Sequence, residues 1–338
     1  HGIVLAKNLK AREYGVKTAE PVWQAKTKCP GLIVLPPNYT LYLRFSKLAS
    51  DIYRSYTNLV EAFGIDECWL DVTESTKLFG NAYTIANTIR NRMKEELGLT
   101  VSVGVSFNKI FAKLGSDMKK PDAVTVIGEN DFKNVIWNLP VGDLMYVGRS
   151  TKAKLTRVGI CTIGDLAGSP RGFLFKCLGK WGETLWCFAN GCDTTPVNNM
   201  DYESTVKGIG NSLTTPKDLC CNEEIKILIY VLADNVAQRL RRHNLKGKTV
   251  QISIRDSNLS YIERQGQLGF YSYTSSEIAK KAYEIFLNCW NWSYNIRLLG
   301  VRVTDLAAAD TYIQLSMFPE NKRVKKELLE RSVDRIRE

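Results

Sequence analysis

The chain has 338 residues, of which 44% are hydrophobic and 24% charged, and it carries a net charge of +11 with a pI near 9.1. This composition can bury the cores of about two globular domains, and it excludes a disordered chain. The positive charge favours a polyanionic partner, nucleic acid before membrane. We expect no membrane span, because the longest apolar run, Ile227 to Ala233, is too short to cross a bilayer, and we expect no signal peptide.

Nine cysteines and two histidines narrow the possible chemistry. The cysteines form no C-x-x-C pair, and Cys187 and Cys192 have no second pair or histidines to complete a zinc site. We expect reduced thiols in a cytoplasmic protein. Ser-His-Asp, Cys-His and histidine-rich metal chemistry are excluded, so any catalysis must use carboxylates, a metal, or lysine and arginine.

The first 57 residues have the pattern of several short elements. Gly15 is a helix stop, Pro21 suits a first helical turn, and Pro36-Pro37 ends an apolar run. We expect strands over His1–Ala6 and Leu32–Leu35 and helices over Lys7–Tyr14, Thr18–Lys26 and Tyr39–Thr57.

Two adjacent carboxylates, Asp66 and Glu67, lie between β-prone runs at Leu59–Phe63 and Cys68–Thr73. Neighbouring side chains of a straight strand point to opposite faces, so these two can converge on one ion only at a bend. Gly64 offers the freedom for that bend. Converging carboxylates suit Mg²⁺, whose shell is completed by water or phosphate. A solvated hairpin tip with two charges is the plainer alternative.

Strands and helices then alternate. We expect helices over Asn81–Leu97 and Ser106–Met118, and strands over Val101–Val105 and Val124–Ile127. This order predicts an α+β domain with one site at a sheet edge, next to the acidic turn.

Residues 131–200 read as short helices separated by glycines, with no convincing strand. Gly148 and Gly159 flank a lysine-bearing segment in the pattern of a helix-hairpin-helix, and Leu178–Gly182 is a weaker second copy. Such a turn presents backbone N–H groups at a helix N-terminus, a phosphate site that ignores base identity. A helical bundle whose glycines only end helices is the alternative.

The last part of the chain follows a polar linker over Asn198–Lys207. We expect two helices against a sheet of about four strands. The helix Asn222–Arg242 ends in a basic cluster, which is either a solvated face or a phosphate-binding surface. The named elements are helices over Asn222–Arg242 and Ser276–Trp290 and strands over Val250–Arg255 and Leu298–Val303.

An amphipathic hexamer, Gln314–Pro319, comes next and could place Leu315, Met317 and Phe318 in a hydrophobic pocket of a partner. The alternative is a last strand that packs on its own domain. The charged segment Arg323–Arg337 is expected to be helical, and its lack of a clear end favours a longer chain.

Several of these segments, in order along the chain, carry a resemblance to Y-family translesion DNA polymerases of the bacterial DNA polymerase IV and UmuC-like group. Gly64–Glu67 resembles the S-x-D-E turn of that family, with Gly in place of Ser. Further matches are Asn8–Gly15 to an N-Y-E-A-R-x-x-G segment, Ser106–Pro121 to an S-x-N-K…A-K…K-P helix, Tyr146–Leu166 to the thumb hairpin, and Gln314–Phe318 to a peptide that binds the sliding clamp.

The resemblance implies an α+β multidomain fold, a right hand of fingers, palm and thumb with an additional C-terminal α/β little finger. The implied parts are fingers at 1–40, palm at 41–128, a helical thumb at 129–200, a linker at 201–207, the little finger at 208–310 and a tail with the clamp peptide at 311–338.

It also implies low-fidelity, template-directed transfer of dNTPs onto a primer 3′-hydroxyl during DNA damage tolerance. Two Mg²⁺ ions, about 4 Å apart, would stabilise the attacking and leaving oxygens. Asp66 would bridge both ions and Glu67 would bind the ion at the primer terminus. Arg12 and Lys120 would hold the triphosphate, and Thr18, with Ala19, would cover the templating base.

The implied partners are primer-template DNA, a dNTP and the sliding clamp (β subunit), with no membrane, and a monomer is expected. The DNA contacts implied are Lys109, Gly148, Arg149, Gly159, Lys207 and Arg242, and the clamp contacts are Gln314, Leu315, Met317 and Phe318.

Two departures from the family pattern affect the expected chemistry. Leu9 stands where many members have a tyrosine that contacts the triphosphate. The third metal carboxylate and the steric-gate aromatic of the family belong to a strand before His1, so the chain as written lacks one metal ligand. Either those residues precede His1 in a longer protein, or the chain is a truncated, inactive form.

Two other functions compete with the polymerase. A non-catalytic relative that binds DNA and the clamp would incorporate no dNTP. Its binding to primer-template would be salt-sensitive: for each phosphate contact, log K would fall by about 0.9 per unit increase in the logarithm of the salt concentration. A helix-hairpin-helix nuclease or glycosylase would explain only the thumb.

Overall fold

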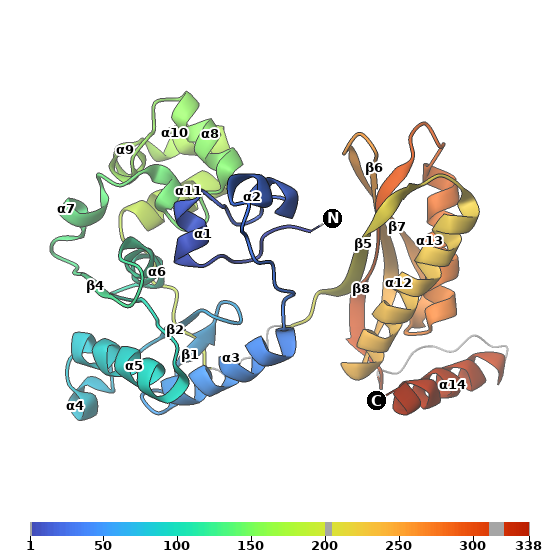
Figure 1. The fold of residues 1–338 in the computed structure, drawn as a ribbon, viewed down its shortest axis with the longest axis horizontal. Helices are drawn as coiled ribbons and strands as arrows, with labels where there is room; N and C mark the ends of the chain where they lie inside the picture. The colour runs from blue at the N-terminus through green and yellow to red at the C-terminus, as the bar shows by residue number, and fades with distance from the viewer. Residues whose placement is uncertain (1, 200–204, 311–320, 338) are drawn as a thin grey trace. The chain divides into compact units, whose positions relative to one another are not determined.

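A computed structural model describes residues 2–199, 205–310 and 321–337. The chain forms two compact units, Gly31–Glu203 and a second one made of His1–Pro30 with Ser204–Glu338. Figure 1 shows the elements in chain order, from blue to red.

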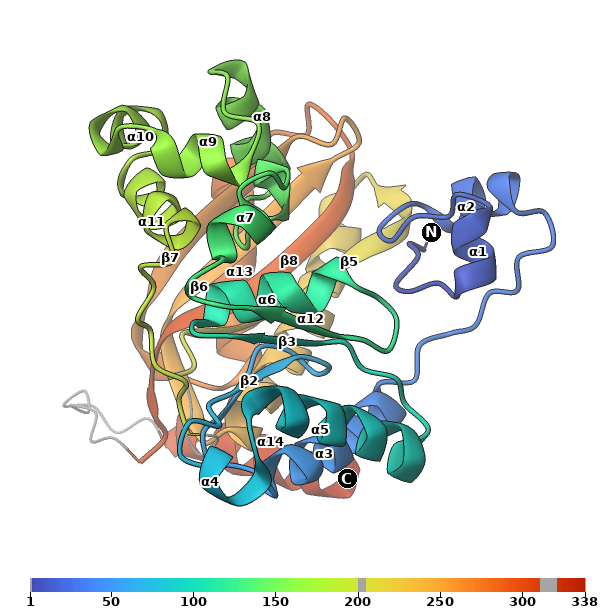
Figure 2. The ribbon, with the colours of Figure 1, turned by 90° about the vertical axis from the view of Figure 1, so that its left-hand side faces the viewer.

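The first unit begins with a helix pair and a hairpin. Helices α3 and α5 pack against each other around Ile52, Ile85, Ile89 and Met93 (Figure 2). Each of them begins at an asparagine, Asn38 or Asn81, whose side chain accepts a hydrogen bond from the N–H three residues on. The elements are α3 (Tyr39–Arg54), β1 (Val60–Ala62), β2 (Cys68–Leu70), α4 (Thr76–Phe79) and α5 (Ala82–Leu97).

A strand–helix–strand unit follows, in which β3 (Val103–Ser106) and β4 (Val124–Ile127) pair in parallel and α6 (Lys109–Met118) connects them. Helix α6 lies directly on β3, since a Cβ added at Gly104 would stand 1.8 Å from the carbonyl oxygen of Ala112. Only a glycine allows a helix this close. The backbone of α6 is therefore held close to the sheet.

The rest of this unit is helical and shares its core with α6. Ile110, Phe111 and Leu114 of α6 pack in the same cluster as Leu155, Ile163 and Leu174 of the helical segment. The predicted boundary between residues 128 and 129 therefore falls within one continuous core. The elements are α7 (Phe132–Ile136), a 3₁₀ turn η1 (Val141–Asp143), α8 (Arg149–Arg157), α9 (Ile163–Gly168), α10 (Arg171–Leu178) and α11 (Lys180–Ala189).

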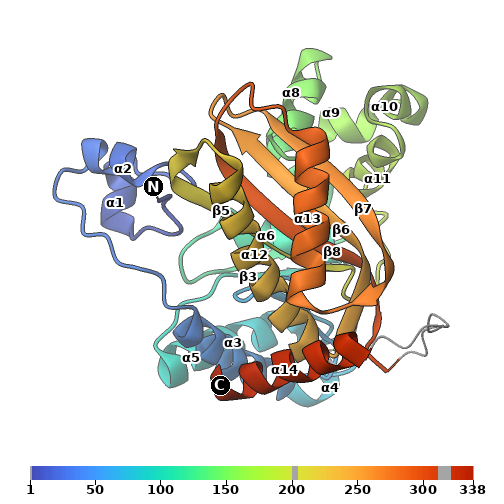
Figure 3. The same cartoon turned by 90° about the vertical axis from the view of Figure 1, so that its right-hand side faces the viewer.

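The C-terminal part of the second unit is a four-stranded antiparallel sheet in the order β5-β8-β6-β7. Helices α12 and α13 lie side by side over one face of this sheet (Figure 3) and fill its core with Ile229, Leu232, Val236 and Phe286. The elements are β5 (Gly208–Leu219), α12 (Asn222–Arg242), β6 (Leu245–Asp256), β7 (Tyr261–Ser272), α13 (Ser275–Cys289) and β8 (Ile296–Ala308).

The last helix, α14 (Asn321–Arg337), is held on this domain by the side chain of Arg241, which is only 5% exposed. The guanidinium pairs with Glu330 at 2.5 Å and with Asp334 at 2.5 Å, and it donates to the carbonyl oxygen of Tyr273 at 3.0 Å. The helix predicted over Arg323–Arg337 is thus confirmed.

Two predicted strands are wrong, and the first three helices are shorter than predicted. Over Leu32–Leu35 the chain is irregular, and Ile33 and Leu35 are more than three-quarters exposed, because this apolar run has no strand to pair with. Over His1–Ala6 the described residues form only a single bridge, Ile3 to Pro21. The N-terminal helices are α1 (Leu9–Glu13) and α2 (Val22–Lys28), so Pro21 precedes the second helix as its cap.

Candidate functional site

The acidic turn joins β1 and β2, which pair antiparallel with Ala62 opposite Cys68. The N–H groups of Phe63 and Gly64 both donate to the carbonyl oxygen of Glu67, at 2.9 and 3.3 Å, and close the turn. Asp66 is exposed at its tip, and the side chain of Glu67 is 39% exposed. The hairpin prediction is confirmed.

The expected role of Gly64 is not supported. Gly64 does not take a positive φ, and a Cβ added to it would meet only Asp66 Oδ1, at an ordinary 3.5 Å. The bend therefore comes from the paired hydrogen bonds to Glu67, and a serine would fit at this position.

Helix α6 faces the hairpin with residues four apart, which lie on one side of a helix. Its start is fixed by Asn108, whose side chain accepts from Phe111 N at 2.8 Å. From there Lys109, Lys113 and Asp117 follow at a spacing of four. The two lysines reach two glutamates of the hairpin, Glu61 and Glu67.

Lys109 is a structural residue of the hairpin. Its side chain is 8% exposed, pairs with Glu61 at 2.5 Å and lies 5.2 Å from the ring centroid of Trp69. Glu61 also accepts from the backbone N–H of Asn198 at 2.7 Å. Burial raises the pKa of Glu61, but the hydrogen bonds from Asn198 and Lys109 outweigh it and hold that pKa below its ordinary value. Lys109 thus has partners within the protein, and its predicted DNA contact stays a prediction.

Lys113 bridges two carboxylates, Glu67 at 2.8 Å and Asp117 at 2.9 Å. Asp117 in turn pairs with Lys120 at 2.6 Å. Burial lowers the pKa of Lys113, yet its bonds to Glu67 and Asp117 outweigh burial and raise it. Lys120, a predicted triphosphate ligand, is thus linked to Lys113 by two ion pairs and to Glu67 by three.

The donor chemistry of the turn fits a hard divalent cation. Asp66 and Glu67 offer carboxylate oxygens, the ligands Mg²⁺ prefers, and Mg²⁺ commonly takes only one or two carboxylates beside water and phosphate. Among the described residues, no group of three or more His, Cys, Asp and Glu side chains is placed to hold a metal ion. The two carboxylates therefore fit part of a magnesium site.

Arg12 and Thr18 belong to the N-terminal segment of the other unit. Arg12 is exposed on α1, which begins at the side-chain cap of Asn8. Thr18 accepts a hydrogen bond from Lys7 Nζ at 2.9 Å, and Ala19 beside it has a φ of 67°. Leu9 is exposed on the same helix.

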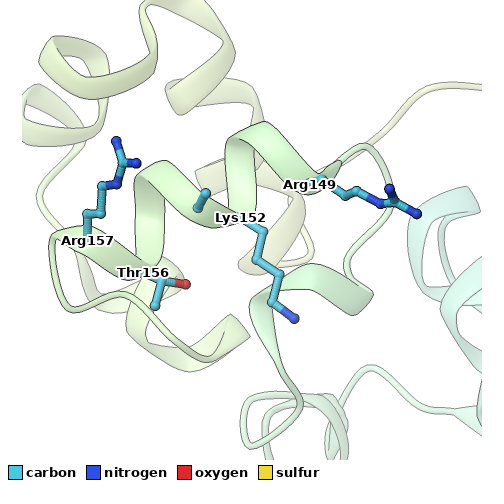
Figure 4. Close-up of a pocket in the computed structure, with 5 residues that line it drawn as sticks. Arg149, Lys152, Thr156 and Arg157 are labelled. Carbon is cyan, nitrogen blue, oxygen red and sulfur yellow. The ribbon is translucent and has the colours of Figure 1, made fainter.

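The helix-hairpin-helix segment carries basic residues that are open to solvent. Gly148 precedes α8, and Gly159, with a φ of 83°, ends the turn after it. Arg149, Lys152 and Arg157 extend from the start, middle and end of α8 (Figure 4). Within the described residues no ion pair neutralises any of these three side chains.

The remaining predicted contacts are those to DNA at Lys207 and Arg242 and those to the clamp. Lys207 is exposed just before β5, and Arg242 is exposed at the end of α12. Gln314, Leu315, Met317 and Phe318 lie outside the described residues. None of the helices in the described ranges is long and apolar enough to cross a membrane.

Three residues of the site received no role in the sequence prediction: Glu61, and Lys113 and Asp117 within the Ser106–Pro121 motif. The spacing of four that links Lys109, Lys113 and Asp117 was visible in the sequence. The pairing of Lys109 with Glu61 and of Lys113 with Glu67 was not predictable, because the partners lie 48 and 46 residues apart in the chain.

Comparisons with known proteins identify the family. The model of the impB/mucB/samB family matches residues 1–117, and that of its C-terminal domain matches residues 206–317. The chain is 62% identical to a DNA polymerase IV of Acetivibrio thermocellus, over 100% of this chain and 85% of that protein. It is 38% identical to DNA polymerase IV 1 of Bacillus subtilis, over 99% and 80%.

The fold agrees. A Y-family DNA polymerase chimera of known structure, Dbh-Dpo4(243-245)-Dbh, superposes with a TM-score of 0.80 at 23% identity, covering 91% of this chain and 88% of that one. The chain therefore belongs to the impB/mucB/samB family, the bacterial Y-family DNA polymerases of the DNA polymerase IV type.

Proposed function

We propose that Asp66 and Glu67 are the carboxylates with which this translesion DNA polymerase binds two Mg²⁺ ions for the transfer of a dNTP onto a primer 3′-hydroxyl. The observation that carries this proposal is the position of the turn: it presents Asp66 and Glu67 to solvent, and the ion pair between Glu67 and Lys113 ties it to the helix that precedes Lys120. Bound Mg²⁺ would supply charge stabilisation for the attacking and leaving oxygens.

The chain's own residues would bind and orient the reactants. Lys120 is half exposed and offers an ammonium to the β and γ oxygens of the triphosphate, and Arg12 would add a bidentate contact. Thr18 and Ala19 are small and would cover the templating base loosely. Arg149, Lys152 and Arg157 would bind phosphates of the primer-template without reading bases, together with Gly148, Gly159, Lys207 and Arg242.

The decisive test is primer extension by the full-length gene product. We expect Asp66→Ala and Glu67→Ala each to abolish extension while leaving primer-template affinity unchanged, because neither carboxylate attracts phosphate. Glu74→Ala, an exposed carboxylate on the same segment, is the matched control and keeps full activity. Extension by either site variant at a near-normal rate would remove these residues from the metal site.

A non-catalytic relative is the outcome in which the wild-type gene product binds primer-template but incorporates no dNTP. The helix-hairpin-helix nuclease or glycosylase does not fit membership of a polymerase family.

We also propose that Gln314, Leu315, Met317 and Phe318 bind the sliding clamp and that the protein acts as a cytoplasmic monomer. The support for clamp binding is the amphipathic pattern of this peptide. The double change Leu315→Ala with Phe318→Ala should weaken capture by the clamp and leave distributive synthesis unchanged. Undiminished capture would show that the peptide packs on its own domain.

A further inference from the structure

Four charged side chains of alternating sign form a continuous line beside the acidic turn. Glu67 contacts Lys113 at 2.8 Å, Lys113 contacts Asp117 at 2.9 Å, and Asp117 contacts Lys120 at 2.6 Å. We call this set the charge chain. Its two ends are the proposed metal ligand and the proposed triphosphate ligand.

Lys113 is the residue on which the charge chain depends. It is 19% exposed, so water screens its contacts less than those of a free surface lysine. Its ammonium satisfies Glu67 with the positive charge that a metal ion would otherwise supply. A cation that binds Glu67 therefore competes with Lys113 for the same carboxylate, and Asp117 is already in place to keep a displaced ammonium paired.

Asp117 has the corresponding position between two lysines. While Lys120 contacts Asp117, the carboxylate divides its attraction between Lys113 and Lys120. When a triphosphate draws Lys120 away, Asp117 can hold Lys113 more strongly. Glu67 is then released from its lysine, at the moment when phosphate oxygens are available to complete the shell of a metal ion.

We propose that Lys113 is a positioning residue that occupies Glu67 as a built-in cation, and that Asp117 transfers it away when Lys120 binds phosphate. The inference rests on the proposed roles of Glu67 and Lys120. It predicts that triphosphate binding and metal binding favour each other through Asp117, without any contact of Lys113 with substrate.

The test measures the dissociation constant of Mn²⁺, from the EPR signal of the free ion, on the full-length protein without nucleotide. Mn²⁺ can bind at several sites, so only the sites whose Mn²⁺ affinity falls in Glu67→Gln are compared between variants. We expect Lys113→Met to tighten Mn²⁺ binding about three- to tenfold, because a competing partly buried ion pair is removed. We expect Asp117→Asn to weaken it, because Lys113 then pairs with Glu67 alone.

Long-range electrostatics would give changes of the same sign, so the double variant decides. If the charge chain acts, Asp117→Asn has no effect once Lys113 is Met, since it acts only through Lys113. Additive effects would overturn the proposal. Lys119→Met removes a neighbouring exposed charge and should leave Mn²⁺ affinity within about twofold.

The two levels of the inference can fail separately. If Glu67→Gln leaves every Mn²⁺ site unchanged, the proposed metal ligand is wrong. If Glu67→Gln weakens a site and Lys113→Met does not tighten it, only the charge chain is wrong. Circular dichroism of each variant, and Lys113→Arg as a charge-preserving variant that should stay near wild type, separate these outcomes from misfolding.

Discussion

Helices α6 and α8 both carry lysines and lie in the same unit, yet the lysines of α6 are paired with carboxylates and the basic residues of α8 are exposed to solvent. On α6, Lys109 and Lys113 are directed to carboxylates of the hairpin and are at most one-fifth exposed. On α8, Arg149, Lys152 and Arg157 are exposed and extend from the helix (Figure 4), and none of them forms an ion pair within the described part of the chain. The first set builds the site, and the second set remains available to phosphate.

The difference arises from what each helix packs against. Helix α6 is pressed onto β3 at Gly104, so its outer face meets the hairpin and its glutamates. Helix α8 buries Leu155 and leaves its basic residues outward. A basic residue is thus a structural or a binding group according to its neighbours, and the following changes test that distinction.

The largest effect is expected from Gly104→Ala. The new Cβ would stand 1.8 Å from a backbone oxygen of α6, which cannot rotate away, so the helix must shift. We expect a loss of about 3 kcal/mol or more in the free energy of unfolding, a fall of roughly 10 °C in Tm. Gly172→Ala on α10, where no atom lies within 4 Å, is the control and should be neutral or slightly stabilising.

The next largest effect is expected from removing one lysine of each basic set in turn and comparing the two variants. Lys109→Met leaves Glu61 without its cation and should cost about 2 kcal/mol, which lowers Tm by roughly 4–8 °C. Lys152→Met should change stability by less than about 0.5 kcal/mol. Differential scanning fluorimetry of both variants measures this contrast.

The same two variants should show the opposite order of effects on DNA binding, with the larger loss in Lys152→Met. Lys152→Met is expected to weaken primer-template binding about fourfold near 0.2 M salt and to reduce the salt slope by about 0.9. Lys109→Met, assayed below its Tm, should keep the wild-type slope. An equal loss of slope in both variants would return Lys109 to the DNA interface.

The smallest effect is expected on the pH dependence of stability, through Glu61. The folded-state pKa of Glu61 is depressed, so its contribution to stability is present above the ordinary glutamate value of 4.5 and is lost as the pH falls through the folded value. At pH 7 Glu61→Gln should cost about 1 kcal/mol, and the difference in Tm from wild type should shrink below pH 4.5. A difference that does not shrink as the pH falls would mean that the carboxylate charge is irrelevant.

The sequence predicted elements with strong periodicity and missed those that depend on partners. The stripe of α12 and the acidic hairpin were located correctly. The central strand β6 alternates and β8 contains a buried apolar run, and both were located in part, whereas the edge strands β5 and β7 are polar or glycine-rich and were not located. Pro216 lies in β5 at its register shift, where a proline is tolerated.

The candidate site divides in the same way. Asp66, Glu67 and Lys120 are readable because they lie in short motifs, while the ion pairs that organise them join residues far apart in the chain. Leu32–Leu35 is apolar enough for a strand, but no local pattern reveals that a partner strand is missing. Long-range pairing was thus the information that the sequence pattern lacked.

The near-burial of the Lys109 ammonium against Glu61 and Trp69 has a practical consequence for handling the protein. Salt screens exposed charges much more than buried ones. Moderate salt should therefore strip DNA from the open basic residues of α8 while the hairpin stays assembled. Inhibition by salt should then be fully reversible on dilution, and high-salt washing during purification should yield nucleic-acid-free protein with an intact acidic turn.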